Sequence, residues 1–160
     1  MNTPPSQCDL VFERDVDVAP PLIWRAWTEP ALLVQWFTPV PWKTVECEID
    51  LRPGGLFRTV LQSPDGVPHQ NIGCFIDVVP AHRLVWTTAL GPGFRPQAAV
   101  PGIPTFTASI TLTPSAVGTR YTARAMHGDE ESCRAHEQMG FEEGWGVALA
   151  QLVALVKTLK

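Results

Sequence analysis

The sequence is poor in charge, and its positive charges are not clustered. Charged residues make up 18% of the 160 residues, and the formal net charge is −4. Binding to nucleic acid or to an anionic membrane surface needs grouped Lys and Arg side chains, so we expect neither partner. No apolar run approaches the ~18 residues that a membrane-spanning helix needs. The N-terminus also lacks the basic and apolar segments of a signal peptide, so we predict a cytoplasmic protein.

Motifs for metals, nucleophiles and phosphates are missing too. The four cysteines form no CxxC pair, and the four histidines form no HxxxH pair. The sequence has no GxSxG motif, and the glycine-rich segment 91–102 lacks the pattern of a phosphate-binding loop. Glu46, Glu48 and Asp50 alternate with apolar residues, so we interpret them as a solvated strand face. We therefore predict no metal site, no cofactor and no catalytic nucleophile.

What the chain does contain is a proline-free C-terminal stretch, from Gly128 to Lys160. Three acidic residues near its start suit the positive end of a helix dipole. Large apolar residues then recur at helical spacing: Trp145, Leu149, Leu152, Val156 and Leu159. This pattern predicts one helix of about thirty residues, roughly 45 Å long, which needs a broad surface to pack on.

Alternating apolar and polar residues predict about seven strands before that helix. The predicted strands span residues 10–18, 45–51, 56–62, 72–79, 83–89, 106–113 and 121–127. Short turns join most of them, which indicates an antiparallel sheet. Two short helices, the first opened by Pro20 and Pro21, are expected between the first two strands.

Several short motifs occur along the chain in a characteristic order. They are Arg25-Ala26-Trp27-Thr28-Glu29-Pro30, Trp36-Phe37, Arg52-Pro53-Gly54-Gly55, Pro64-Asp65-Gly66, Val79-Pro80, Arg83-Leu84-Val85 and Met139-Gly140-Phe141-Glu142-Glu143-Gly144-Trp145-Gly146. In these motifs and their spacing, residues 9–159 resemble the bacterial homologues of the activator of the heat-shock-protein-90 ATPase. That family is part of the SRPBCC superfamily, with the START lipid-transfer domains and the birch-pollen-allergen fold.

The resemblance implies an α+β helix-grip fold. In this architecture a curved antiparallel sheet of about seven strands surrounds a long C-terminal helix, with two short helices after the first strand and an internal cavity. We expect one such domain over residues 1–160, in which residues 1–7 form a loose arm. The superfamily includes lipid carriers, cyclases and hydrolases, so the fold alone does not decide the function.

Residue sizes favour a cavity between the sheet and the long helix. Ala108, Ala123 and Ala125 occupy positions that we expect to face Gly140 and Gly144, and small residues on both sides leave room. The alternative is a core filled by aromatic side chains. We predict the following ligand contacts around this space: Trp36, Trp42, Phe75, Trp86, Phe106, Tyr121, His136, Met139, Gly140 and Trp145.

Two loops and two histidines are the further candidates for this site. We expect the proline- and glycine-rich segment 91–104 to cover the ligand as a lid, together with the elbow 36–42. Folding could bring His127 and His136 to one end of the cavity. In one hypothesis His136 and Tyr121 bind a polar head group or transfer protons. In the other, His136 is a partly exposed side chain that is hydrogen-bonded to its surroundings.

These observations predict a binding protein that holds a small hydrophobic or amphipathic molecule in its cavity. An enzyme of the cyclase or hydratase type is the first alternative, because a His or Tyr in the same cavity could transfer protons. A homodimeric protein-interaction domain is the second alternative. Its contact would use Val147, Ala150 and Ala154 on the back of the long helix.

Overall fold

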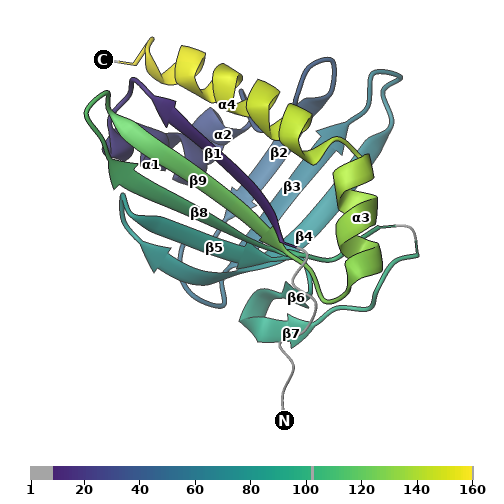
Figure 1. The fold of residues 1–160 in the computed structure, drawn as a ribbon. Helices are drawn as coiled ribbons and strands as arrows, with labels where there is room; N and C mark the ends of the chain where they lie inside the picture. The colour runs from purple at the N-terminus through teal and green to yellow at the C-terminus, as the bar shows by residue number, and fades with distance from the viewer. Residues whose placement is uncertain (1–8, 102, 160) are drawn as a thin grey trace.

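The structure, a computed structural model, describes residues 9–101 and 103–159. The predicted loose arm, residues 1–7, lies outside the described residues. Within them, a seven-stranded antiparallel sheet is strongly bent, and the last helix lies across its open side (Figure 1). This arrangement confirms the α+β helix-grip fold.

The sheet brings the two ends of the chain together. Its strands are β1 (Leu10–Val16), β2 (Lys43–Ile49), β3 (Leu56–Gln62), β4 (Pro68–Val79), β5 (Arg83–Thr87), β8 (Thr107–Pro114) and β9 (Thr119–Met126). Their order is β1-β9-β8-β5-β4-β3-β2, so the first strand pairs with the last, with Leu10 opposite Ala125. β1 and β2 therefore lie at opposite edges. Between them in the chain come the two predicted short helices, α1 (Pro20–Thr28) and α2 (Pro30–Leu33).

The C-terminal helix is broken, which corrects the prediction of one thirty-residue helix. α3 (Glu130–Gln138) begins after Asp129, whose carboxylate accepts a hydrogen bond from the Ser132 backbone N–H at 2.7 Å. It ends where Gly140 adopts a left-handed conformation with φ of 90°. α4 (Phe141–Val156) then runs in a different direction (Figure 1). Its 16 residues span only about 24 Å.

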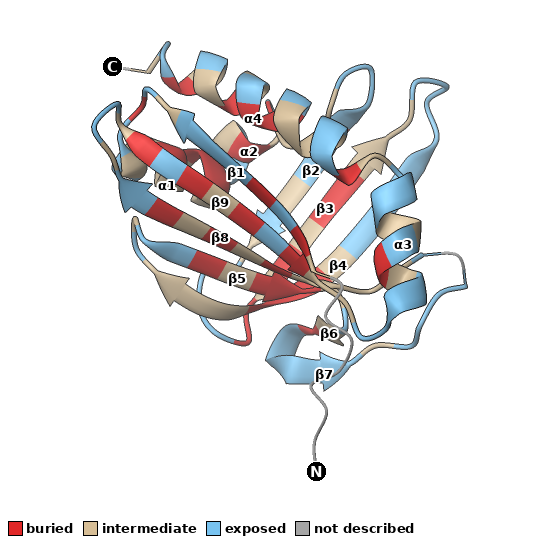
Figure 2. Cartoon of the chain, in the orientation of Figure 1, coloured by how far each residue is buried: buried red, intermediate tan, exposed pale blue. Residues whose placement is uncertain are grey.

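The apolar face of α4 belongs to the core. Leu149, Leu152 and Val156 are buried, as their helical spacing predicts, whereas Trp145 and Leu159 are partly buried. Figure 2 shows buried residues alternating with more exposed ones along β8 and β9. This two-residue period is typical of strands with one face on the core.

One predicted strand has a local irregularity. Val45 is 44% exposed, although its position in the alternating pattern predicts burial. The register between β2 and β3 shifts between Thr44 and Glu46, and Thr44 is buried instead. A bulge inserts an extra residue into one strand, so the side chains on either side of it change face.

The segment that follows β5 folds into a small hairpin. β6 (Leu90–Gly91) and β7 (Arg95–Pro96) flank a short 3-10 turn, η1 (Pro92–Phe94). This hairpin packs on the turn between β2 and β3, where the Gly93 N–H donates to the Gly54 carbonyl oxygen at 2.8 Å. A Cβ at Gly54 would lie 2.8 Å from the Phe94 ring. Gly54 also has a φ of 81°, a left-handed conformation that favours a glycine at this position of the Arg52-Pro53-Gly54-Gly55 motif.

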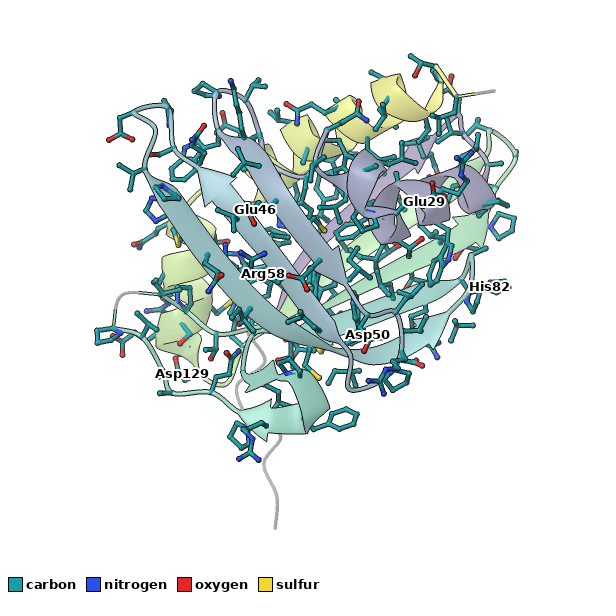
Figure 3. All side chains as sticks on the ribbon, turned by 180° about the vertical axis from the view of Figure 1, so that it is seen from behind. Glu29, Glu46, Asp50, Arg58, His82 and Asp129 are labelled. Carbon is teal, nitrogen blue, oxygen red and sulfur yellow. The ribbon has the colours of Figure 1, made fainter. Side chains whose placement is uncertain are left out.

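The acidic face of β2 is an outer surface of the sheet. Arg58 of β3 lies beside Glu46 in Figure 3, with a nitrogen–oxygen distance of 3.2 Å, and its other terminal nitrogen is 3.4 Å from Glu48. The Arg58 Nε–H also donates to Gln70 of β4 at 2.8 Å. These cross-strand pairs explain the acidic pattern as part of the sheet surface.

Candidate functional site

A cavity of about 370 Å³ lies between the sheet, the elbow after α2 and the α3–α4 junction. Most of its walls are apolar, and the aromatic rings that line it are Trp27, Trp36, Phe37, Phe57, Trp86, Phe106, Phe141 and Trp145. The polar side chains that line it are Thr38, Thr59, Asn71, Thr88 and His136. This volume, the apolar walls and the few polar groups are typical of sites that bind small molecules.

The strands supply one wall through their two-residue period. Phe57, Thr59 and Leu61 of β3 all line the cavity, because alternate residues of a strand point to the same face. Trp86 of β5 and Phe106, next to β8, extend this wall. Phe57 and Trp86 contact each other edge to face, with ring centroids 5.4 Å apart, which is a favourable aromatic geometry.

Trp27 of α1 is the central ring of the aromatic wall. Its centroid lies 4.8 Å from that of Trp36, 5.0 Å from Trp86 and 6.3 Å from Trp145. The buried Trp27 side chain also donates its indole N–H to the Tyr121 hydroxyl at 3.1 Å. One side chain therefore connects α1 with the elbow, the sheet and α4.

Gln151 holds the elbow after α2 against α4. Its amide nitrogen donates to the carbonyl oxygens of Trp36 and Thr38, both at 2.9 Å. Its Oε1 accepts a hydrogen bond from the Val40 backbone N–H at 3.1 Å. Trp36 and Thr38 line the cavity, so Gln151 positions this wall from outside it. The sequence signal for this role is a single polar residue in the apolar stretch between Gly144 and Val156.

Two histidines meet at the α3 end of the cavity. Nε2 of His127 lies 2.8 Å from Nδ1 of His136, which lines the cavity. The His136 ring also contacts the rings of Phe106 and Phe141, at centroid distances of 4.6 and 5.4 Å. Burial, and then the charge of His127, lower the pKa of His136 to about 4. His136 is therefore a neutral imidazole at pH 7, with one nitrogen that donates and one that accepts.

Seven of the ten residues predicted as ligand contacts line the cavity: Trp36, Trp86, Phe106, His136, Met139, Gly140 and Trp145. Trp42 and Phe75 do not. Trp42 is 37% exposed, and its ring centroid lies 5.5 Å from that of His69. Phe75 is buried and stacks on Phe57, with centroids 5.1 Å apart, so Phe57 occupies the position at the cavity wall.

Tyr121, the third predicted contact that does not line the cavity, is buried on β9. Its hydroxyl accepts the hydrogen bond from Trp27, and burial raises the pKa of this hydroxyl above its usual range. The hypothesis that Tyr121 and His136 act together on a ligand is therefore wrong. The group that His136 contacts is His127.

Of the predicted cover, the elbow 36–42 lines the cavity through Trp36, Phe37, Thr38 and Pro39. No described residue of segment 91–104 lines it. The segment is linked to the site only indirectly, because the Gln97 amide donates to the carbonyl oxygens of Ile72 and Thr88 at 2.8 and 3.0 Å, and both of these residues line the cavity. The small inward residues of β8 and β9 are buried but do not line it either: Ala108, Ala123 and Ala125.

Comparison with known proteins identifies the family. Residues 17–157 match the family described as activator of Hsp90 ATPase homolog 1-like protein. The chain belongs to this family. It is similar to protein NE0264 from Nitrosomonas europaea, with 49% sequence identity over 93% of this chain and 94% of that chain, and a TM-score of 0.87.

Two less similar proteins share the fold of this chain. A protein from Rhodobacter sphaeroides is 24% identical over 99% of this chain and 98% of that chain, with a TM-score of 0.81. Protein Ms6760 from Mycobacterium smegmatis is 23% identical over 96% of this chain and 93% of that chain, with a TM-score of 0.77. No protein of curated function matches the chain.

Other kinds of site receive no support in the described part of this family member. No group of three or more His, Cys, Asp and Glu side chains in residues 9–101 and 103–159 is placed to hold a metal ion. No helix in the same residues is long and apolar enough to cross a membrane. Burial, and then the charge of Glu48, raise the pKa of Cys47 to about 11, so its thiol stays protonated at neutral pH.

Several lining residues were not predicted as ligand contacts: Trp27, Phe37, Phe57, Thr59 and Phe141. Some of them follow patterns that could have revealed them. Phe57 and Thr59 alternate on a strand that was predicted correctly. Phe141 precedes Trp145 by four residues, the spacing that places two residues on the same side of a helix.

Proposed function

We propose that the protein binds a small hydrophobic or amphipathic molecule in the aromatic cavity. The observation that supports this most strongly is a space of about 370 Å³ with mostly apolar walls, which eight aromatic rings line. The cavity reaches the surface, so without a ligand its apolar walls face water. An apolar molecule that covers these walls gains about 25 cal/mol per Å² of apolar surface removed from water.

The cavity also has a route for a ligand to enter. Met139, at the α3–α4 junction, lines the cavity and is 69% exposed. Asn71 of β4 lines it as well and is exposed. Because lining residues reach the surface, a molecule can enter from solvent without unfolding the sheet. This favours exchange of a ligand over permanent enclosure.

Binding is better supported than catalysis. Among the described residues, no Asp, Glu, Lys, Arg, Cys or Tyr side chain lines the cavity. Cyclase or hydratase chemistry needs a proton donor or acceptor near the ligand, and His136 is the lining residue of that kind. With a pKa of about 4, His136 is a weak base at neutral pH. Turnover of a bound molecule would favour the enzyme alternative.

A homodimer is the second alternative. Val147, Ala150 and Ala154 are exposed on α4, on the side away from the core, as the sequence predicts. Native mass spectrometry of the purified protein measures the mass of the assembly and of any retained small molecule. A retained small molecule supports the cavity proposal, and a dimer without one supports the interaction domain.

Binding of N-phenyl-1-naphthylamine, a neutral probe that fluoresces in apolar surroundings, tests the proposal directly. We expect saturable binding of one molecule per wild-type protein. Gly144 lines the cavity, so the side chain of Gly144→Leu should occupy part of it. We expect the Kd of this variant to rise about tenfold or more, equivalent to ~1.4 kcal/mol.

Two matched variants control for effects on the helix itself. A Cβ at Gly144 meets only Pro39, at 3.7 Å, and a Cβ at Gly146 meets Phe12 at 3.7 Å. Both are ordinary contacts. Gly144→Ala and Gly146→Ala should therefore change the Kd less than about twofold. The proposal fails if the wild-type protein does not bind the probe, or if Gly144→Leu binds it as well as the two alanine variants do.

A further inference from the structure

His136 is the only titratable side chain among the described residues that line the cavity. It therefore places an imidazole at one end of a space with mostly apolar walls. The α3–α4 junction beside it carries three exposed acids, Glu137, Glu142 and Glu143. No described Lys or Arg lines the cavity, and Arg14 pairs with Glu142 outside it at 3.3 Å. This end offers a hydrogen bond in acidic surroundings, without a cation for an anionic head group.

One nitrogen of the His136 ring is engaged, and the other is left for a ligand. Nδ1 lies 2.8 Å from Nε2 of His127. Phe106 and Phe141 contact the imidazole from two other elements, which fixes the plane of the ring. Nε2 of His136 makes no hydrogen bond within the described residues, and no buried polar side-chain atom of these residues lacks a partner. Nε2 is therefore not sealed by the protein, and the ring that carries it lines the cavity.

The neutral His136 ring can present Nε2 to a ligand in two ways. When His127 donates to Nδ1, the proton of His136 is on Nε2, which then donates to a ligand oxygen. In the opposite tautomer Nδ1 donates to His127, and Nε2 accepts from a ligand hydroxyl. An uncharged hydroxyl can bind to either tautomer, because it both donates and accepts. A carbonyl oxygen only accepts, so it binds the tautomer in which Nε2 carries the proton. A carboxylate would lose its hydration here without gaining a counter-charge, which is costly.

We propose that Nε2 of His136 binds the hydroxyl or carbonyl oxygen of an uncharged amphipathic ligand, and that the cavity selects such ligands over carboxylates of the same shape. This assignment rests on the proposed binding function. His127 is a positioning residue in it, because it holds the ring through Nδ1. The apolar body of the ligand packs against the aromatic walls.

Three probes of similar shape test the assignment: 2-naphthol, 2-methylnaphthalene and 2-naphthoate. Calorimetric titration at pH 7.5 measures the Kd of each probe for the wild-type protein and for His136→Phe. The Kd of 2-methylnaphthalene divided by that of 2-naphthol should fall about 3- to 10-fold in His136→Phe, the effect of one neutral hydrogen bond. 2-Naphthoate should bind the wild-type protein at least about tenfold more weakly than 2-naphthol.

His82→Phe is the matched control, because His82 is exposed and does not line the cavity. This variant should keep the wild-type ratio of the two Kd values, that of 2-methylnaphthalene divided by that of 2-naphthol.

Nitrogen-15 NMR of the wild-type protein gives a second measurement that does not depend on how His136→Phe folds. 2-Naphthol should shift the Nε2 resonance of His136 more than the Nδ1 resonance. His127→Phe should shift Nδ1 of His136 in the absence of any probe, an effect that a purely structural role for His127 would not produce.

The outcomes separate this assignment from the proposed function. If the probes bind and the ratio is the same in the wild-type protein and His136→Phe, the assignment to His136 is overturned and the cavity remains a binding site. If 2-naphthoate binds as tightly as 2-naphthol, the selection against carboxylates is overturned. If none of the three probes binds, the proposed function fails, and the assignment fails with it.

Discussion

The two halves of the sheet differ in the size of certain inward side chains and in whether those side chains line the cavity. In β8 and β9 the inward residues Ala108, Ala123 and Ala125 are small, wholly buried and away from the cavity lining. In β3 and β5 the inward residues Phe57 and Trp86 are large and form the cavity wall. Small side chains let neighbouring elements approach until the space is filled, whereas large rings hold the elements apart. A cavity is therefore not found where the sequence has its small residues.

The largest expected effect comes from creating a hole in the packed half. Leu152 of α4 is wholly buried, and Leu152→Ala should lower the free energy of unfolding by about 3 kcal/mol. Met139, exposed at the cavity mouth, is the control. Met139→Ala should change the free energy of unfolding by less than about 0.5 kcal/mol. Urea unfolding measures both. Equal losses would mean that the mouth of the cavity is as tightly packed as the core.

A matched pair of enlargements compares the two halves directly. Ala123→Leu adds volume where the residue is wholly buried, and overpacking should cost about 2 kcal/mol. Ala148→Leu adds the same atoms at a residue that lines the cavity, and should change stability by less than about 1 kcal/mol. Thermal unfolding of the two variants measures the difference. If Ala148→Leu is as destabilising as Ala123→Leu, the cavity half does not tolerate added volume better than the packed half.

The elbow connects the cavity half to α4 through Gln151. Gln151→Leu keeps most of the side-chain volume but removes its hydrogen bonds to the backbone of Trp36, Thr38 and Val40. We expect a loss of about 1–2 kcal/mol in unfolding free energy. Binding of N-phenyl-1-naphthylamine should also weaken, because the elbow carries cavity walls. Gln35→Leu is the control, since the one hydrogen bond of the Gln35 side chain within the described residues is local, to the Ala31 carbonyl at 3.0 Å. Unchanged probe binding by Gln151→Leu would show that the elbow keeps its position without this contact.

The smallest expected effect is a pH dependence from His136. Its pKa is about 4 in the folded protein, below the ordinary value of ~6.5 for an unfolded chain. Between these values the unfolded chain binds a proton that the folded protein does not, so stability falls as pH drops from 6.5 towards 4. Above pH 6.5 this contribution is constant. Because His136 is only partly buried, we expect a loss of about 1 kcal/mol between pH 7.5 and 5.0.

Other groups titrate over the same interval, so the informative quantity is a difference between variants. Urea unfolding of the wild-type protein and of His136→Phe at pH 7.5 and 5.0 gives this difference, with His82→Phe as the control. The wild-type protein and His82→Phe should lose about 1 kcal/mol more than His136→Phe. If all three proteins lose the same stability on acidification, the low pKa of His136 is contradicted.

Much of the fold could be predicted because its signals are local. Alternation along β8 and β9 places their buried residues correctly, and the spacing of Leu149, Leu152 and Val156 identifies the buried side of α4. The break at Gly140 was missed, although a glycine in a left-handed conformation is a common end of a helix. The acidic start and the apolar end of the stretch were treated as one helix, when they are two.

The candidate site could be predicted only in part, because facing inward is not the same as lining a cavity. Tyr121 and Phe75 face inward as their strands require, yet other rings lie between them and the cavity. Trp42 belongs to an irregular elbow, where no period indicates the direction of a side chain. Segment 91–104 has the composition of a lid, but its described residues take no part in the cavity lining.

The order of the residues was enough to establish the elements and their buried faces, because these depend on periods of two and 3.6 residues that each segment carries within itself. The resemblance to the family came from the order and spacing of short motifs along the chain. The position, walls and polar end of the cavity arise from distances between elements that are remote in the chain. Those distances are set by how the large rings of α1, β3, β5 and α4 pack against one another. No single segment determines these distances. They are fixed only when the bent sheet and the two C-terminal helices pack together.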